Sequence, residues 1–178
     1  MKKEYSWRTL SSEIAFKGKW LTVRVDQVLR PDGSQGTYEL IDKKDFVVMI
    51  PRIDNRFYLV EQYRYAVGAR SWEFPQGGCE DVIDLETCAK KELKEELGLT
   101  PLNLVSLGNL WVAVGNSTQG CEVFLAENLI NGEQKLEESE SDLIWSTFTE
   151  DEIVEMIKDG RIRSSSTIAA FNLYLLKR

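Results

Sequence analysis

The chain has 178 residues, of which 43% are hydrophobic and 29% are charged, and its formal net charge is −7. This composition is typical of a single globular domain with a buried core, and it excludes a largely disordered chain. No uninterrupted apolar run approaches the roughly 18–20 residues that a membrane-spanning helix needs, and the first residues lack the apolar segment of a secretory signal. We therefore expect a cytoplasmic protein with no membrane partner.

In chain order, the first third of the sequence has the alternating pattern of β-strands, with a turn cluster at PDGSQG, residues 31–36. We predict strands over residues 20–30, 37–43, 45–54 and 56–64, and a short one over 71–78. A helix is predicted from the N-cap Asp84 to Leu97, and Gly98 ends it. The later elements are strands over 102–114 and 121–129, an acidic loop over 130–142, a strand over 143–148, and helices over 149–160 and 164–177. The chain is therefore expected to be α/β with a mixed sheet.

The sequence contains no histidine, which removes imidazole bases and histidine-bound zinc from consideration. Its three cysteines, Cys79, Cys88 and Cys121, are odd in number and lack Cys-x-x-Cys spacing, so we expect neither a disulfide framework nor a structural zinc site. Acid–base or metal chemistry must then use carboxylates, which favour hard cations such as Mg²⁺ or Mn²⁺. No stripe of clustered lysine and arginine is present, which argues against a nucleic-acid partner.

The helix predicted to end at Leu97 carries an unusual arrangement of acids. On a helical wheel, Glu92 and Glu96 fall inside the apolar arc, Glu95 falls at its edge, and the lysines face the opposite side. Two like charges one turn apart are unfavourable, and more so when they are partly desolvated. Either a divalent cation is bound between these acids, or this end of the helix is wet and the acids are simply solvated.

Residues 77–99 resemble the signature of the Nudix hydrolases, G-x5-E-x7-R-E-U-x-E-E-x-G-U, where U is a bulky aliphatic residue. The matching positions are Gly77, Glu92, Leu93, Glu95, Glu96, Gly98 and Leu99. Ile83 and Lys91 depart from it, because the family has a glutamate and an arginine there, which are implied to pair and to brace the loop against the helix. Both partners have changed together, so Ile83 can pack, Lys91 can reach solvent, and the acids implied as metal ligands are intact.

The resemblance extends beyond this signature, from about residue 40 to the end. The pieces QYR, WEFP and GG within residues 60–78 are similar to the subgroup that hydrolyses ADP-ribose and other nucleoside diphosphate sugars, as are residues 121–129 and the Ser165-Ser166-Thr167 loop. Many ADP-ribose hydrolases carry a proline in the loop that corresponds to residues 112–120, and this chain has none. The resemblance implies a Nudix fold, with a mixed β-sheet core between helices in an α/β/α sandwich.

The resemblance also implies a domain organisation. Residues 44–178 would form the Nudix hydrolase domain, and residues 1–43 would supply N-terminal strands. Relatives in this subgroup are mostly homodimers whose N-terminal strands cross to the partner. Residues 1–43, which are strand-like and rich in aromatic side chains, would suit such a dimerisation arm.

The residue roles implied by the resemblance concern a metal and a base. The metal, Mg²⁺ with Mn²⁺ as the alternative, would be held by the carbonyl of Gln76 and by the carboxylates of three glutamates, Glu92, Glu95 and Glu96. Without histidine, the general base should be a carboxylate of the late loop LEESESD, with Glu140 as the first choice and Glu138 as the second; Glu95 is also included among the catalytic candidates. The alternative for this loop is a solvated acidic run.

Three further residues are candidates for substrate binding. Arg64 ends a predicted strand and could clamp a phosphate, because the guanidinium fork fits phosphate oxygens in pairs; a surface arginine is the alternative. Glu73 in WEFP would serve the substrate or support a ligand, or else be a partly buried structural acid. Trp72, like Trp20, could stack a base, although core tryptophans are commoner.

The predicted function is Mg²⁺-dependent hydrolysis of the pyrophosphate bond of a nucleoside diphosphate sugar such as ADP-ribose, giving a nucleoside monophosphate and a sugar phosphate. One alternative is a Nudix hydrolase for another nucleoside diphosphate derivative, a dinucleotide or a triphosphate. The other is a non-catalytic Nudix-like ligand sensor, in which Ile83 and Lys91 record a relaxed constraint. Retention of the three acids in the signature argues against the sensor.

Overall fold

The structure is a computed structural model, and it describes residues 6–79 and 84–178, apart from the side chain of Ser139. The chain divides into two compact units, which are described separately. The first comprises Met1–Lys44 and Trp111–Gln119, and the second comprises Asp45–Leu110 and Gly120–Arg178.

The first unit is built on an antiparallel sheet of three strands in the order β1-β2-β3. These strands are β1 (Arg8–Lys17), β2 (Thr22–Leu29) and β3 (Gln35–Asp42). The turn between β2 and β3 contains Asp32, whose carboxylate accepts hydrogen bonds from Ser34, and Gly33, whose φ of 86° favours glycine. The strands and the turn predicted in this part of the sequence are confirmed.

The second unit contains a seven-stranded sheet in the order β10-β5-β4-β9-β8, with β6 beside β5 and β7 beside β4. Its strands are β4 (Phe46–Ile53), β5 (Arg56–Arg64), β6 (Ala69–Glu73), β7 (Gln76–Gly78), β8 (Leu99–Trp111), β9 (Gly120–Asn131) and β10 (Ile144–Thr149). β4 pairs in parallel with β9 and antiparallel with β5 and β7, so the predicted mixed sheet is confirmed.

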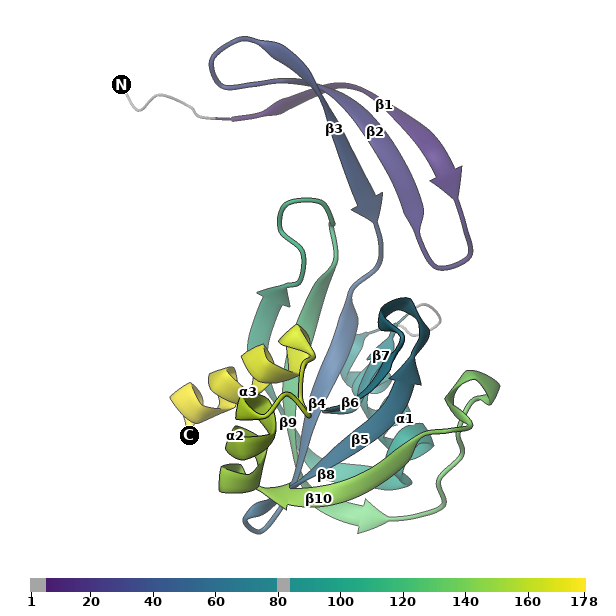
Figure 1. Ribbon diagram of the computed structural model, residues 1–178, viewed down its shortest axis with the longest axis vertical. Coiled ribbons are helices and arrows are strands. Elements are labelled where there is room, and N and C mark those ends of the chain that lie inside the picture. Colours follow the sequence, from purple (N-terminus) through teal and green to yellow (C-terminus); the bar gives the residue numbers. More distant parts are fainter. Residues whose placement is uncertain (1–5, 80–83) are drawn as a thin grey trace. The chain divides into compact units, whose positions relative to one another are not determined.

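Helices cover both faces of this sheet (Figure 1). They are α1 (Leu85–Leu97), α2 (Glu150–Lys158) and α3 (Ser165–Lys177). Along β4, Val48 and Ile50 pack in a hydrophobic cluster with α2 and α3, whereas Val47 and Met49 pack in a second cluster with α1. The strand is therefore apolar on both sides because both sides are buried. This arrangement is the predicted α/β/α sandwich.

The helix boundaries follow the predicted signals. Asp84 caps α1 by accepting a hydrogen bond from the Thr87 amide at 2.8 Å, and Gly98 follows the helix with φ 68°. Thr149 and Glu152 form the predicted capping box of α2. No helix among the described residues is long and apolar enough to cross a membrane.

Candidate active site

The glycine turn that ends β7 lies directly against α1. Gly77 pairs with Val47 of β4, and this pairing brings its Cα close to the helix. A Cβ atom added to Gly77 would overlap the carboxylate of Glu92. Any larger residue at this position would therefore force the Glu92 carboxylate to move, because glycine leaves the room that this carboxylate occupies.

Two acidic side chains of α1 point into the interior of the second unit. Glu96 is completely buried, and Glu92 keeps 9% of its surface exposed. Burial raises the pKa of Glu92 to about 7. Burial, together with the nearby carboxylates of Glu140 and Glu92, raises the pKa of Glu96 well above its usual range. The predicted inward orientation of these two acids is confirmed.

A third carboxylate joins them from the acidic loop. The loop contains a short 3₁₀ helix, η2 (Glu138–Glu140), and the Glu140 side chain lies at its end. Single carboxylate oxygens of Glu92, Glu96 and Glu140 all lie within 4.8 Å of one another. Glu140 is half-buried, and burial raises its pKa as well. Glu138, the second choice for a base, is exposed and does not belong to this group.

The chemistry of this group fits a divalent cation. Both carboxylate oxygens of Glu96 are buried without a hydrogen-bond partner among the described residues. Such oxygens are costly to bury when they are ionised, unless a positive charge contacts them. Carboxylate oxygens from several side chains are the usual ligands of Mg²⁺ and Mn²⁺. The unpartnered oxygens of Glu96 thus mark the position at which a cation is needed.

The remaining predicted positions of the signature lie around this group. Glu95 is half-buried and forms an ion pair with Lys91 at 3.3 Å, and Lys91 is exposed as predicted. Ile83 lies outside the described residues, so the predicted packing of its side chain stays a prediction. Gln76 directly precedes Gly77 in β7, the strand that contacts α1.

A chain of polar contacts links Arg64 to the start of α3. The guanidinium of Arg64 donates to Glu73 at 2.7 Å, and the side-chain amide of Gln76 donates to the other oxygen of Glu73 at 2.7 Å. The amide oxygen of Gln76 accepts a hydrogen bond from the Ser166 hydroxyl at 2.9 Å. Burial raises the pKa of Glu73, and Arg64 opposes this shift. The buried carboxylate of Glu73 therefore orients the half-exposed guanidinium of Arg64.

Trp72 occupies a different environment from these polar residues. Its ring packs edge to face against Phe148 at a centroid distance of 4.9 Å, beside the hydrophobic cluster under α2 and α3. Trp72 therefore packs at the edge of the core, which is the alternative to stacking on a base.

The structure differs from the sequence analysis in one covalent feature. Cys79, next to the glycine turn, forms a disulfide with Cys88 in α1, with a Cα–Cα distance of 5.6 Å. The expectation that the cysteines form no disulfide is therefore wrong in this structure, and only Cys121 is free and buried. The cysteine count could not reveal this pair, because Cys79 and Cys88 meet only when the turn packs on the helix.

Sequence reasoning also missed two groups of contacts. The resemblance to the nucleoside diphosphate sugar hydrolases pointed to Ser166, but it did not predict the hydrogen bond from Ser166 to Gln76. Arg70 and Asp142, which form an ion pair across the end of the acidic loop, carried no signal beyond their charge. These contacts join residues distant in the chain, so a local pattern does not show them.

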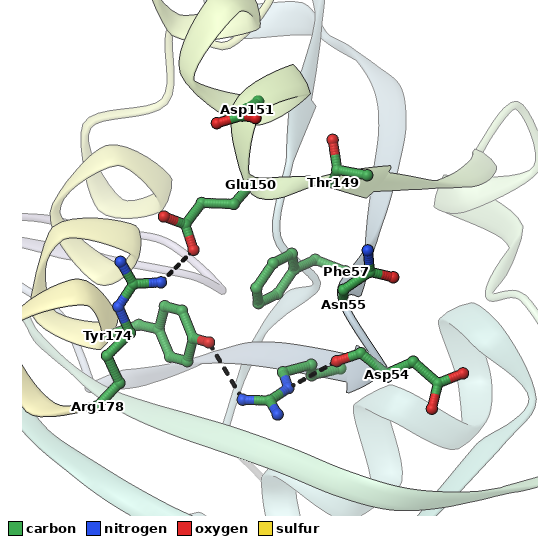
Figure 2. Close-up of a pocket in the computed structure, with 9 residues that line it drawn as sticks. Asp54, Asn55, Phe57, Thr149, Glu150, Asp151, Tyr174 and Arg178 are labelled. Atoms are coloured by element: carbon green, nitrogen blue, oxygen red, sulfur yellow. Dashed lines mark hydrogen bonds and ion pairs between the residues drawn. The ribbon is translucent and has the colours of Figure 1, made fainter.

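A separate pocket of about 390 Å³ lies near the end of β4, where Arg52 lines it, whereas the glycine turn beside Glu92 pairs near the start of this strand. Figure 2 shows the residues that line the pocket. Its lining includes Tyr174 and Arg178 of α3 and Glu150 of α2. Arg178 pairs with Glu150, and Arg52 donates hydrogen bonds to the Tyr174 hydroxyl at 3.2 Å and to the Asp54 carbonyl at 3.1 Å. Arg178, Glu150 and Arg52 thus have partners within the protein, and the other acids of the lining, Asp54 and Asp151, are exposed. Within the described part of the chain, the pocket therefore holds no buried, unpartnered charge like that of Glu96.

Comparison with known families agrees with this geometry. Residues 43–171 match the NUDIX domain, and residues 7–41 match the nucleoside diphosphate sugar hydrolase N-terminal domain. The chain belongs to the Nudix family, and it is a Nudix pyrophosphohydrolase.

Individual relatives cover nearly the whole chain. An ADP-ribose pyrophosphatase of Mycobacterium tuberculosis is 31% identical, over 93% of this chain and 82% of the relative. A methanol dehydrogenase activator of Bacillus methanolicus is 30% identical, over 96% of this chain and 93% of the relative. The solved structure of an ADP compounds hydrolase has the same fold, with a TM-score of 0.84, 19% identity, and coverage of 94% of this chain and 91% of that one.

Proposed function

We propose that the protein hydrolyses the pyrophosphate bond of a nucleoside diphosphate sugar, with ADP-ribose as the first candidate, in a Mg²⁺-dependent reaction. The observation that carries this proposal is the convergence of Glu92, Glu96 and Glu140, with the Glu96 oxygens buried and unpartnered among the described residues. The match of residues 7–41 to the N-terminal domain of nucleoside diphosphate sugar hydrolases and the similarity to an ADP-ribose pyrophosphatase support the substrate class.

Glu92 and Glu96 would hold the metal, with the carbonyl of Gln76 and with Glu95 as further ligands. A bound Mg²⁺ would neutralise the diphosphate and lower the pKa of the attacking water. The carboxylates converge from α1 and from the acidic loop, so the substrate diphosphate would lie between these two elements. Mn²⁺ would serve as the alternative cation, because it accepts the same oxygen ligands.

Glu140 is proposed as the general base. Its carboxylate would take a proton from water as the water oxygen forms a bond to one phosphorus and the bridging P–O bond breaks. The products are a nucleoside monophosphate and a sugar phosphate. Burial raises the pKa of Glu140, and a carboxylate with a raised pKa is a stronger base.

Arg64 is proposed to contact a phosphate of the substrate. Glu73 holds one edge of its guanidinium, and this contact fixes the direction of the remaining N–H groups. A guanidinium that is already oriented loses less conformational freedom when it binds a phosphate. Glu73 would therefore act on the substrate through Arg64.

A substrate screen tests the proposed reaction. Nucleotide sugars, dinucleotides and nucleoside triphosphates are incubated with the protein and Mg²⁺, and phosphate is measured after a phosphatase is added. Turnover of nucleotide sugars, with a nucleoside monophosphate as product, is the expected result. Preference for a triphosphate or a dinucleotide would favour another Nudix activity. If no diphosphate is hydrolysed, the chain is better explained as a ligand sensor.

The Glu140→Gln variant tests the proposed base. We expect kcat to fall by about 10² to 10⁴, the usual contribution of a positioned base, while Mg²⁺ affinity changes little. A loss of Mg²⁺ affinity in the same variant would instead assign Glu140 to the metal ligands. A fall in kcat of less than about tenfold would exclude Glu140 as the base.

We also propose that the strands of the first unit form a homodimer interface. β1 is an edge strand whose side chains Leu10, Ile14 and Phe16 are exposed, and exposed apolar patches mark interaction surfaces. Light scattering should give twice the chain mass of 20.4 kDa, and Ile14→Lys should shift the protein toward the monomer. A monomeric wild-type protein at micromolar concentration would contradict this proposal.

A further inference from the structure

Arg70 of β6 connects β5 to the end of the acidic loop, through Glu61 on one side and Asp142 on the other. Its Nε donates to the Glu61 carboxylate at 2.8 Å, and its Nη2 donates to the Glu61 carbonyl at 3.1 Å. On the other side, Nη1 donates to the Asp142 carboxylate at 2.5 Å, and Nη2 donates to the Asp142 carbonyl at 3.0 Å. The planar guanidinium fork thus fixes Asp142 against the sheet.

Asp142 belongs to the same short turn as Glu140. The Leu143 amide donates to the Glu140 carbonyl at 2.9 Å, and Leu143 is buried in the cluster beneath α1. The Tyr63 amide of β5 donates to the Asp142 carboxylate at 3.1 Å, and this bond, with Arg70, lowers the pKa of Asp142. Asp142 therefore stays ionised, and it is anchored to the sheet two residues after Glu140.

The beginning of the acidic loop is attached to the metal-binding helix itself. The Gly132 amide donates to the Gly98 carbonyl at 2.7 Å, and the Lys135 amide donates to the Glu95 carbonyl at 3.0 Å. The side-chain amide of Gln134 donates to the Glu96 carbonyl at 2.5 Å. The loop is thus held by α1 at one end and by β5 and β6 at the other, with Glu140 between the two attachments.

We propose that Arg70, acting through Asp142, is a positioning residue that holds the Glu140 carboxylate opposite Glu92 and Glu96. This proposal rests on the proposed role of Glu140. Arg70 and Asp142 are both partly exposed, and ion pairs of this kind contribute little to the global free energy of unfolding. The main consequence of the contact is therefore geometric, because a displacement of about 1 Å in a catalytic group can cost a hundredfold in rate.

The chain provides a matched control in Arg56. Arg56 lies at the opposite end of β5 and binds Thr147 and Glu152 with the same kind of fork, at a similar side-chain exposure of 40% against 38% for Arg70. Arg56→Ala removes an equivalent cross-link between strands, but it lies far along β5 from the acidic loop. Comparing Arg70→Ala with Arg56→Ala separates positioning of Glu140 from general stabilisation.

The experiment combines hydrogen exchange and kinetics on the full-length chain. In Arg70→Ala, amide exchange of the segment 136–143 should accelerate at least about tenfold while α1 stays protected, because only the local opening free energy changes. The same variant should lower kcat by about tenfold to a hundredfold with KM nearly unchanged. In a Glu140→Gln background, Arg70→Ala should lower kcat no further, since Arg70 acts only through that carboxylate. Arg56→Ala should change neither measurement.

Three results would count against the positioning role. If exchange of residues 136–143 is unchanged in Arg70→Ala, the contact does not hold the loop, whatever the activity. If Glu140→Gln lowers kcat but Arg70→Ala does not, the base assignment stands and the role of Arg70 fails. If Glu140→Gln leaves kcat unchanged, the proposed base itself is wrong, and the functional part of this inference fails with it while the exchange result still reports on the loop.

Discussion

The carboxylate group and the pocket at the far end of β4 differ in how their charges are neutralised. At the carboxylate group, the buried oxygens of Glu96 have no hydrogen-bond partner among the described residues, and nearby acids raise its pKa further. In the pocket, Arg178 pairs with Glu150 (Figure 2). Arg52 donates a hydrogen bond to the Tyr174 hydroxyl. A concave surface alone does not identify a functional site. A buried charge without a partner does identify one, because burying such a charge is unfavourable unless a ligand neutralises it.

The largest effect should come from the two acids of α1. Glu92→Gln and Glu96→Gln should each lower kcat/KM at least about a thousandfold, because a metal contributes several kcal/mol and each 1.4 kcal/mol is tenfold. Calorimetric titration with Mg²⁺ should show the corresponding loss of binding. If both variants bind Mg²⁺ normally, these carboxylates do not hold the metal, and the carboxylate group is no better a candidate site than the pocket.

A smaller effect is expected when the space beside Glu92 is filled. Gly77→Ala places a methyl group where the Glu92 carboxylate lies, so kcat should fall by about tenfold to a hundredfold through displacement of that ligand. Gly115→Ala is the control, because a Cβ atom there would meet nothing within 4 Å. Steady-state kinetics on both variants test this expectation. Equal activity of the two would mean that Glu92 can move without cost.

The metal-free protein should lose stability as the pH rises. In the unfolded chain Glu92 ionises near its ordinary pKa of 4.5, but in the folded protein it ionises only at about 7. Its favourable contribution is therefore complete below pH 4.5 and is lost as the pH rises through 7, at a cost of a few kcal/mol. Urea unfolding in EDTA across this range should show the decline, and Glu92→Gln should reduce it. A decline of the same size in the variant would exclude Glu92 as its source.

The smallest effect is expected in the pocket. Arg178→Ala removes an exposed ion pair, so the free energy of unfolding should change little and kcat should stay within about twofold of the wild type. Thermal unfolding and the substrate assay measure these two quantities. A large fall in kcat in this variant would show that the pocket, despite its paired charges, takes part in the reaction.

Local patterns predicted most of the secondary structure and the inward acids, but they gave no range for β1 (Arg8–Lys17) and one strand over 71–78 where the structure has β6 and β7. The helix over Leu85–Leu97 begins and ends at its predicted cap residues, and the wheel correctly placed Glu92 and Glu96 on the packed face. A helix of fixed period determines which side chains share a face, so these predictions need only sequence spacing. The Cys79–Cys88 disulfide was not predicted, because its formation depends on how the glycine turn packs on α1.

The sequence by itself determined the kinds of groups available, the elements that carry them, and the family to which the chain belongs. Only the tertiary structure decided that Glu140, distant in the chain, meets Glu92 and Glu96, and that Arg70 donates a hydrogen bond to Asp142 at the end of the acidic loop. The physical reason is that periodicity acts over a few residues of one element. Contacts between elements decide which carboxylates meet at one site and which are paired with a lysine or an arginine. Local spacing in the sequence does not contain this information.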